Sequence, residues 1–163
     1  MRHPVRLSLL TALLSACAFG ASAQSWGATA HPATFENGTR YCMLWFGETE
    51  PLMNVTATGD AQTYLVVSSV FSDVPAGADV TFGFKGGIRI AVSPLDKLRP
   101  QEYPGFISGD VSEEALSAIL ARMALGSSDN APMTVIAGGK TQDFPLLSSA
   151  GDASSFQACK AEL

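Results

Sequence analysis

Histidine is the rarest of the common catalytic residue types in this sequence. Only His3 and His31 occur in 163 residues, and His3 lies in an N-terminal segment that we expect to be removed. Hydrolytic triads need a histidine held rigidly beside the nucleophile. His31 precedes Pro32 in a stretch without periodicity, so we interpret it as a solvated loop histidine and predict no catalytic residue of this kind.

Clustered positive charge is also missing. Eight Lys and Arg residues follow Ala23, against fifteen Asp and Glu, which gives this part of the chain a net charge of −7. Nucleic acids and anionic lipid surfaces attract basic patches. The composition therefore argues against both as partners.

The motifs of metal, phosphate and paired-carboxylate sites are absent or unconvincing. No H-E-x-x-H, C-x-x-C, EF-hand or P-loop pattern is present. Glycosidases use two carboxylates, but Glu48 and Glu50 fit a polar turn, and Glu113 and Glu114 fit the start of a helix. We therefore predict a protein without cofactor or metal that is not an enzyme.

Methionines could bind copper in an exported protein. Four of them fall on apolar faces of expected strands or helices, where we interpret them as core residues: Met43, Met53, Met123 and Met133.

A long apolar run occurs only at the N-terminus. Arg2 and Arg6 precede apolar residues 7–14, and the small residues Ala21-Ser22-Ala23 follow. This order predicts a signal peptide over residues 1–23, cleaved before Gln24, and the run is too short for a good membrane span. We expect a periplasmic or secreted protein with no transmembrane span after processing.

A second processing route stays open at Cys17. Leu14-Ser15-Ala16-Cys17 resembles a lipobox, in which the cysteine is acylated and anchors the protein to a membrane. The residues after Cys17 stay apolar, which favours cleavage after Ala23.

Because Cys17 is either removed or acylated, two cysteines remain that can pair, Cys42 and Cys159. A pair of cysteines in an exported chain most often forms a disulfide, and this one would join the two ends of the domain. Free thiols or a metal pair are the alternative, although no further ligands lie nearby in the sequence.

The pattern after Gln24 predicts a β-rich domain. Residues 24–39 have several breakers and are expected to be an irregular lead-in. Strand patterns follow at 40–46, 52–58 and 63–70, with 64–67 expected to be buried on both faces. Two hairpins are expected around glycine pairs, one joining 79–84 to 88–92 around Gly86-Gly87, the other joining 133–137 to 140–146 around Gly138-Gly139.

One amphipathic helix is expected between the hairpins. Asp110 and Glu113 match a capping box, Gly126 ends the pattern, and apolar residues recur at helical spacing: Leu116, Ile119, Leu120 and Met123. The tail from Asp152 to Lys160 could form a last short helix. The expected fold is therefore α+β, a single antiparallel, β-rich, sandwich-like domain over residues 40–163 with one packed amphipathic helix and a terminal disulfide.

Residues 93–109 form the longest connection rich in proline and glycine. Long structured loops often carry function, so Tyr103 and Phe106 are candidate partner contacts. The alternative is that both anchor the loop to the core.

The C-terminal half has a recognisable layout of short motifs, which are Leu116, Met123-Ala124, Pro132-Met133-Thr134-Val135-Ile136, Gly138-Gly139, Phe144-Pro145-Leu146-Leu147, Ser148 and Phe156-Gln157-Ala158-Cys159. This layout resembles the C-terminal half of the invasion-associated locus B family of small exported bacterial proteins. It implies a β-sandwich-like domain in the periplasm or on the cell surface, with no known catalytic residues. This chain departs from the family in lacking a second, central cysteine pair.

Together these observations favour a non-catalytic exported binding or accessory module, with an envelope protein or a small ligand as its partner. The alternative is a small-ligand carrier or an inhibitor of an envelope enzyme.

Overall fold

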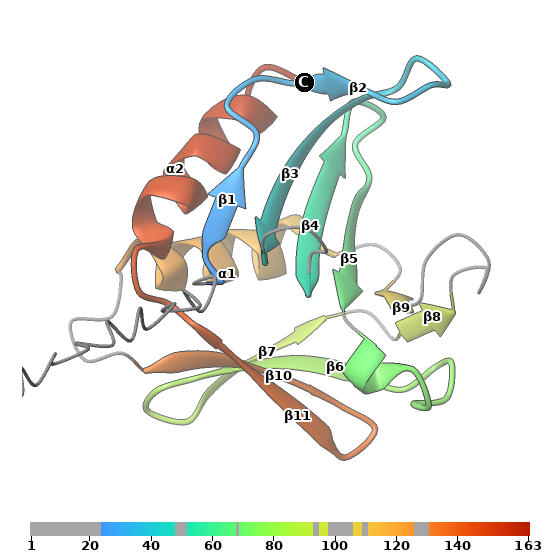
Figure 1. Ribbon diagram of the computed structural model, residues 1–163, viewed down its shortest axis with the longest axis vertical. Coiled ribbons are helices and arrows are strands. Elements are labelled where there is room, and N and C mark those ends of the chain that lie inside the picture. The colour runs from blue at the N-terminus through green and yellow to red at the C-terminus, as the bar shows by residue number, and fades with distance from the viewer. Residues whose placement is uncertain are drawn as a thin grey trace, which may run out of the picture.

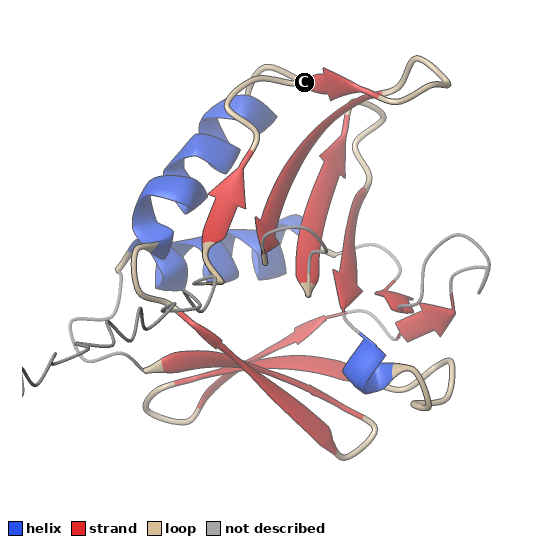
Figure 2. Cartoon of the chain, in the orientation of Figure 1, coloured by secondary structure: helices blue, strands red, loops and turns tan. Residues whose placement is uncertain are grey.

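The computed structural model describes residues 24–47, 52–67, 69–92, 95–97, 106–108, 111–125 and 131–163, with only the backbone described at 69, 95–97 and 106–108. They form two antiparallel sheets and two α-helices (Figures 1 and 2), the α+β sandwich-like fold that the sequence predicts. The strands are β1 (Trp26–Ala28), β2 (Ala33–Thr34), β3 (Arg40–Phe46), β4 (Met53–Thr58), β5 (Thr63–Val67), β6 (Val80–Phe84), β7 (Ile88–Val92), β8 (Leu95–Lys97), β9 (Phe106–Ser108), β10 (Pro132–Ala137) and β11 (Lys140–Pro145). The helices are the short 3-10 helix η1 (Ser69–Phe71), α1 (Glu113–Ala124) and α2 (Ser149–Lys160).

The larger sheet has the strand order β1-β3-β4-β5-β9-β8, and β2 pairs with the far end of β3. Successive residues of a strand point to opposite faces. Leu44, Val55 and Leu65 are paired neighbours on β3, β4 and β5, and all three are buried on the face toward the core.

The smaller sheet has the order β11-β10-β6-β7 and consists of two hairpins. Both hairpins turn at the predicted glycine pairs, Gly86-Gly87 and Gly138-Gly139, and all four glycines have positive φ. In the β10–β11 hairpin the two glycines form the whole loop, and two successive residues with positive φ are what the two-residue type I′ turn requires. The β6–β7 hairpin has a three-residue loop that begins at Lys85.

One hydrophobic core joins the two sheets. The ring of Phe46 on β3 contacts Phe144 on β11 edge to face, with centroids 5.5 Å apart, and lies 5.3 Å from Trp26 on β1. The Trp26 indole N–H also donates a hydrogen bond to the carbonyl oxygen of Pro145 at 2.6 Å. The indole therefore buries its rings in the core while its polar atom bridges the two sheets.

The two α-helices pack against each other in antiparallel orientation. At one end, the buried Ser149 hydroxyl donates to the carbonyl oxygen of Met123 at 3.0 Å. At the other end, the last residue of α2 forms an ion pair with the first residue of α1. The predicted helix pattern is confirmed, with all four of its apolar residues buried, and the tail forms a full second helix.

The N-cap of α1 is Ser112, whose hydroxyl accepts a hydrogen bond from the Ala115 N–H at 3.2 Å. The predicted cap, Asp110, lies outside the described residues. Serine and aspartate are both good N-caps. The position is decided by Val111, whose N–H donates to the Thr63 carbonyl at 2.6 Å and holds the chain against β5 up to that point.

Three predicted segments differ from the structure. Residues 24–39 are not wholly irregular, because β1 and β2 both pair with β3. Strand β5 ends at Val67, and η1 follows where the sequence predicted a continued strand. Within 93–109, β8 and β9 pair with each other and extend the larger sheet beyond β5.

Burial on both faces is found on β4 instead of β5. Every residue of β4 is buried, whereas Tyr64 and Val66 of β5 are only half-buried. Strand β4 lies between β3 and β5, whose larger side chains flank its threonines.

No helix in the described ranges is both long enough and apolar enough to cross a membrane.

Candidate functional site

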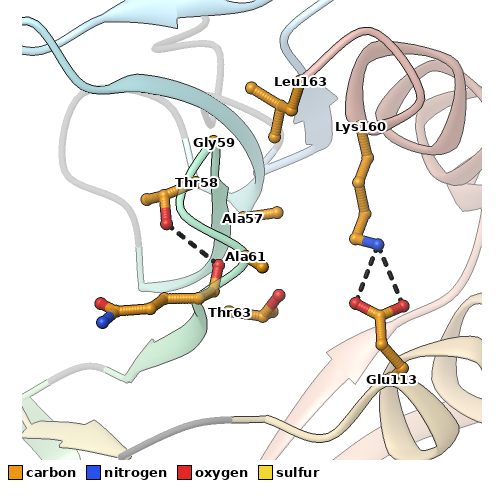
Figure 3. Close-up of a pocket in the computed structure, with 9 residues that line it drawn as sticks. Ala57, Thr58, Gly59, Ala61, Thr63, Glu113, Lys160 and Leu163 are labelled. Carbon is orange, nitrogen blue, oxygen red and sulfur yellow. Dashed lines mark hydrogen bonds and ion pairs between the residues drawn. The ribbon is translucent and has the colours of Figure 1, made fainter.

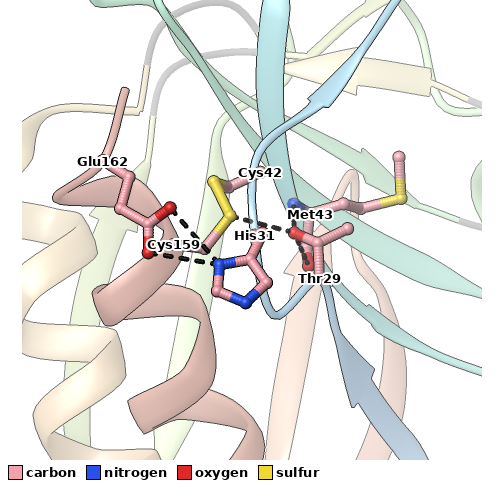
Figure 4. Close-up of a disulfide and its surroundings, with 6 residues drawn as sticks. All are labelled: Thr29, His31, Cys42, Met43, Cys159 and Glu162. Atoms are coloured by element: carbon pink, nitrogen blue, oxygen red, sulfur yellow. Dashed lines mark hydrogen bonds and ion pairs between the residues drawn. A yellow bond between two sulfur atoms is a disulfide. The ribbon is translucent and has the colours of Figure 1, made fainter.

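The disulfide fixes one wall of the candidate site. Cys42 of β3 and Cys159 of α2 are bonded, with their Cα atoms 5.9 Å apart and both residues fully buried, which confirms the predicted pairing. Thr29 lies beside the bridge (Figure 4): its hydroxyl contacts the Cys159 sulfur at 3.3 Å and accepts a hydrogen bond from the Met43 N–H at 2.9 Å. The end of α2 is thereby held against β3.

Lys160 follows Cys159 directly, so the bridge also determines where its ammonium group lies. The Lys160 Nζ is 2.8 Å from Oε1 and 2.9 Å from Oε2 of Glu113, the first residue of α1. The Lys160 side chain is more buried, at 29% exposed, than that of Glu113, at 67%. A carboxylate at a helix N-terminus is further stabilised by the helix dipole.

A pocket of about 200 Å³ opens between this ion pair and the turn that joins β4 to β5 (Figure 3). The turn residues form the opposite wall, and Ala57 and Thr63, which pair across β4 and β5, line it deeper in the sheet. The full lining is Ala57, Thr58, Gly59, Ala61, Gln62, Thr63, Glu113, Lys160 and Leu163.

The hydroxyl groups of two threonines in this pocket differ in their hydrogen bonds. The Thr58 hydroxyl contacts Asp60 and donates to the Gln62 carbonyl at 3.2 Å, which closes the turn. The Thr63 hydroxyl, although its residue is only 3% exposed, makes no hydrogen bond to any described part of the chain. It points into the pocket on the side that faces Glu113 and Lys160 (Figure 3).

The pocket therefore presents donors and acceptors whose charges cancel. Glu113 supplies a carboxylate, Lys160 an ammonium group, and Thr63 a hydroxyl that both donates and accepts. Within the described ranges, no three His, Cys, Asp or Glu side chains are grouped so that they could hold a metal ion.

A second candidate surface lies on the opposite face of the larger sheet. We call it the aromatic face, and it consists of Tyr41, Met43, Trp45, Tyr64 and Val66. All five side chains are half-buried, and among the described elements both α-helices pack on the other face, where the disulfide lies (Figure 1).

Neighbouring residues support the aromatic face. Phe35 stacks on Tyr41 with ring centroids 3.9 Å apart. Trp45 lies over Gly27 of β1, where an added Cβ atom would be 2.5 Å from the indole ring. Asn54, paired with Trp45 across the sheet and 9% exposed, accepts a bond from Thr56 at 3.2 Å, but its amide N–H groups have no partner within the described residues.

The residues predicted from the sequence are distributed as follows. Tyr103, the candidate lipidation residue Cys17, and the pair Glu48 and Glu50 lie outside the described residues. The backbone of Phe106 pairs with Val67 of β5 and Lys97 of β8, so its segment continues the larger sheet.

His31 and the methionines complete this comparison. His31 is 80% exposed and its Nδ1 lies 3.3 Å from Glu162 (Figure 4), in agreement with a solvated loop histidine. Met53, Met123 and Met133 are core residues as predicted. Met43 differs, because it lies half-buried on the aromatic face.

Comparison of the chain with protein-family models, with curated proteins and with solved structures finds no match. The likeness of the C-terminal half to the invasion-associated locus B family therefore stays a prediction.

Thr63 and Lys160 were not singled out from the sequence. Thr63 is the first residue of an apolar strand, and Lys160 is a single lysine at the end of a weakly amphipathic tail. The sequence did contain one signal. Lys160 adjoins Cys159, and the predicted disulfide with Cys42 therefore also predicts where Lys160 lies.

Proposed function

We propose that this protein is an exported, non-catalytic module that binds a partner protein through the aromatic face. The signal-peptide pattern and the bridged cysteines support export, because disulfides persist in oxidising compartments. The lack of a histidine-based or motif-based catalytic set supports a binding role.

The single observation that carries the proposal is the composition of the aromatic face. Interface cores are enriched in Tyr, Trp, Phe and Met and depleted in Lys, Glu and Asp. The five residues of this face include two tyrosines, a tryptophan and a methionine, and no charge, on a chain whose net charge is −5. An uncharged aromatic patch on an acidic protein is typical of a protein-binding surface.

Trp45 is the expected anchor of this interface. Binding energy concentrates in a few residues, most often Trp, Tyr and Arg, near the centre of the contact. The Trp45 ring is supported by Gly27 on one side, and its indole N–H makes no hydrogen bond to the described residues. A partner can therefore bury the ring and accept this hydrogen bond without rearranging the sheet.

Strand β9 extends the same interface in our proposal. β9 adds a strand beside β5 and pairs Ile107 with Val66 of the aromatic face. The candidate contact Tyr103 precedes this strand in the sequence. Tyr103 stays a predicted partner contact.

The test is cross-linking of the tagged, exported protein in cells, followed by mass spectrometry of the captured proteins. We expect one dominant partner with the wild-type chain, and a loss of about thirtyfold or more in its capture with Trp45→Ala, as for an anchor residue. The matched control is Leu147→Ala, which removes an apolar side chain that is 61% exposed outside the aromatic face and is expected to leave capture unchanged.

A second variant separates the ring from its support. Gly27→Ala places a Cβ atom where the Trp45 ring now lies, so it moves the ring without removing it and is expected to weaken capture as well. Equal capture of the partner by the wild type, by Trp45→Ala and by Gly27→Ala would contradict the proposal.

A further inference from the structure

We propose that the pocket between the β4–β5 turn and the Glu113–Lys160 ion pair is a binding site for a small neutral molecule that carries several hydroxyl groups, of the size of one sugar ring. This site is distinct from the aromatic face and does not depend on the proposed function.

The first argument is the Thr63 hydroxyl. Buried polar groups in folded proteins nearly always have a hydrogen-bond partner, and one without a partner requires an explanation. Thr63 is 97% buried as a residue, since 3% of it is exposed, and its hydroxyl has no partner in the described chain. Valine has the same shape without this cost, so a hydroxyl aimed into a pocket is explained by a ligand that bonds to it.

The second argument is the Glu113–Lys160 pair on the opposite wall. The carboxylate accepts from Lys160 through both oxygens, at 2.8 and 2.9 Å, and each oxygen keeps lone pairs for further donors. Lys160 keeps donor capacity as well. A hydroxyl is the group that uses all of these partners, because it donates to a carboxylate and accepts from an ammonium group or from Thr63.

The charge balance then selects a neutral ligand. The pair is internally compensated, so an anion bound to Lys160 would be repelled by the adjacent Glu113 carboxylate, and a cation bound to Glu113 would be repelled by the adjacent Lys160 ammonium group. The net charge of −5 further disfavours anions. A polyol adds hydrogen bonds without breaking the ion pair.

The size and apolar lining set the remaining limits. The volume of about 200 Å³ is below the roughly 300–1,000 Å³ of pockets for drug-sized ligands. Ala57, Ala61 and Leu163 also line the pocket and present methyl groups, which suit the C–H bonds of a sugar ring.

The experiment is an NMR titration of the oxidised protein with D-glucose, N-acetylglucosamine and myo-inositol as neutral probes, and with inorganic phosphate and ethanolamine as charged probes. We expect at least one neutral probe to give saturable shifts of the amide signals of Thr63, Glu113 and Lys160 in the millimolar range. The phosphate and ethanolamine titrations are expected to give no saturable shift there.

Thr63→Val tests the hydroxyl directly. We expect it to weaken binding of the neutral probe by about tenfold, as for the loss of one hydrogen bond, without lowering the thermal midpoint, because the hydroxyl has no protein partner. The matched control is Thr56→Val on the neighbouring strand, 1% exposed, whose hydroxyl donates to Asn54. We expect this control to lose stability and to keep the affinity.

Glu113→Gln tests the charge. It keeps the size of the side chain but removes the ion pair with Lys160, and we expect weaker binding of the neutral probe and new binding of phosphate beside the released ammonium group. The proposal is overturned if no neutral probe gives saturable shifts, if phosphate or ethanolamine alone binds the wild type, or if Thr63→Val binds the neutral probe like the wild type. Partner capture is measured separately, so failure of this site leaves the aromatic face to its own test.

Discussion

The disulfide is expected to supply a large part of the stability of this domain. Cys42 and Cys159 are 117 residues apart, and closing a loop of this length reduces the entropy of the unfolded chain by the equivalent of about 5 kcal/mol. Small domains have total stabilities of about 5–15 kcal/mol. Replacing both cysteines by alanine therefore brings the protein close to its unfolding threshold at room temperature.

The assay is urea unfolding followed by tryptophan fluorescence, which reports on Trp26 in the core and on the half-buried Trp45. With a slope of about 2 kcal/mol per molar urea, a loss of about 5 kcal/mol lowers the midpoint by about 2.5 M. The wild type in excess reductant should move to the midpoint of the double alanine variant, because the cross-link, and not the sulfur atoms, carries the effect.

The control for this experiment is His31→Ala, which removes an exposed contact with Glu162 near the same end of α2. Exposed polar contacts contribute little to stability, so its midpoint should match that of the wild type. The reasoning is refuted if the double alanine variant, or the reduced wild type, unfolds at the same urea concentration as the oxidised protein. Alkylation without reductant, which should add no mass to the oxidised chain, verifies that the bridge was present.

Three further predictions concern single positions. Ser112→Ala removes the N-cap of α1 and should cost about 1 kcal/mol in urea unfolding; no change would show that the cap lies elsewhere. Gly138→Ala should destabilise by about 1–3 kcal/mol, since its Cβ would lie 2.6 Å from Val74, whereas Gly139→Ala meets no neighbouring atom and should cost only the strain of its positive φ; equal losses would contradict this reasoning. Mass spectrometry of the exported protein should give a chain that begins at Gln24, and a lipid-shifted mass would show the acylated alternative instead.

The hairpins could be predicted because they depend on local sequence, and the disulfide could be predicted by counting the cysteines of the processed chain. Gly86-Gly87 and Gly138-Gly139 supply positive φ at two successive positions, whatever the rest of the chain does. Cys42 and Cys159 were the two cysteines left after processing. Neither prediction needed to know which elements lie side by side.

The pocket could not be predicted in this way, because its walls come from three elements. Glu113 and Lys160 are 47 residues apart, and Thr63 belongs to a third segment. Glu113 was correctly placed at a helix start, but its partner depends on the antiparallel packing of the helices. The N-cap was predicted at Asp110 but is Ser112 for a similar reason. A contact between distant segments, from Val111 to β5, determines where the helix begins.

The aromatic face was not predicted, although two separate predictions, the strand over residues 40–46 and the disulfide, identify it when they are combined. Alternation on strand 40–46 places Cys42 and Leu44 on one face and Tyr41, Met43 and Trp45 on the other. Both sets are apolar, so the pattern alone does not tell which one is inside. A bridged Cys42 faces the helix that carries its partner, and this assigns the three larger side chains to the outer face.

The alternation continues on β5 and makes the two proposed sites separable. Thr63 is directed to the pocket on the helix side, while the next residue, Tyr64, belongs to the aromatic face on the opposite side. A substitution at one position therefore leaves the other site in place, provided that the strand keeps its register with β4. We expect Thr63→Val to weaken sugar binding without changing partner capture, and Tyr64→Ala to have the reverse effect. If either substitution weakened both activities together, the two surfaces would not act as independent sites, and a ligand in the pocket would have to be coupled to the partner through β5.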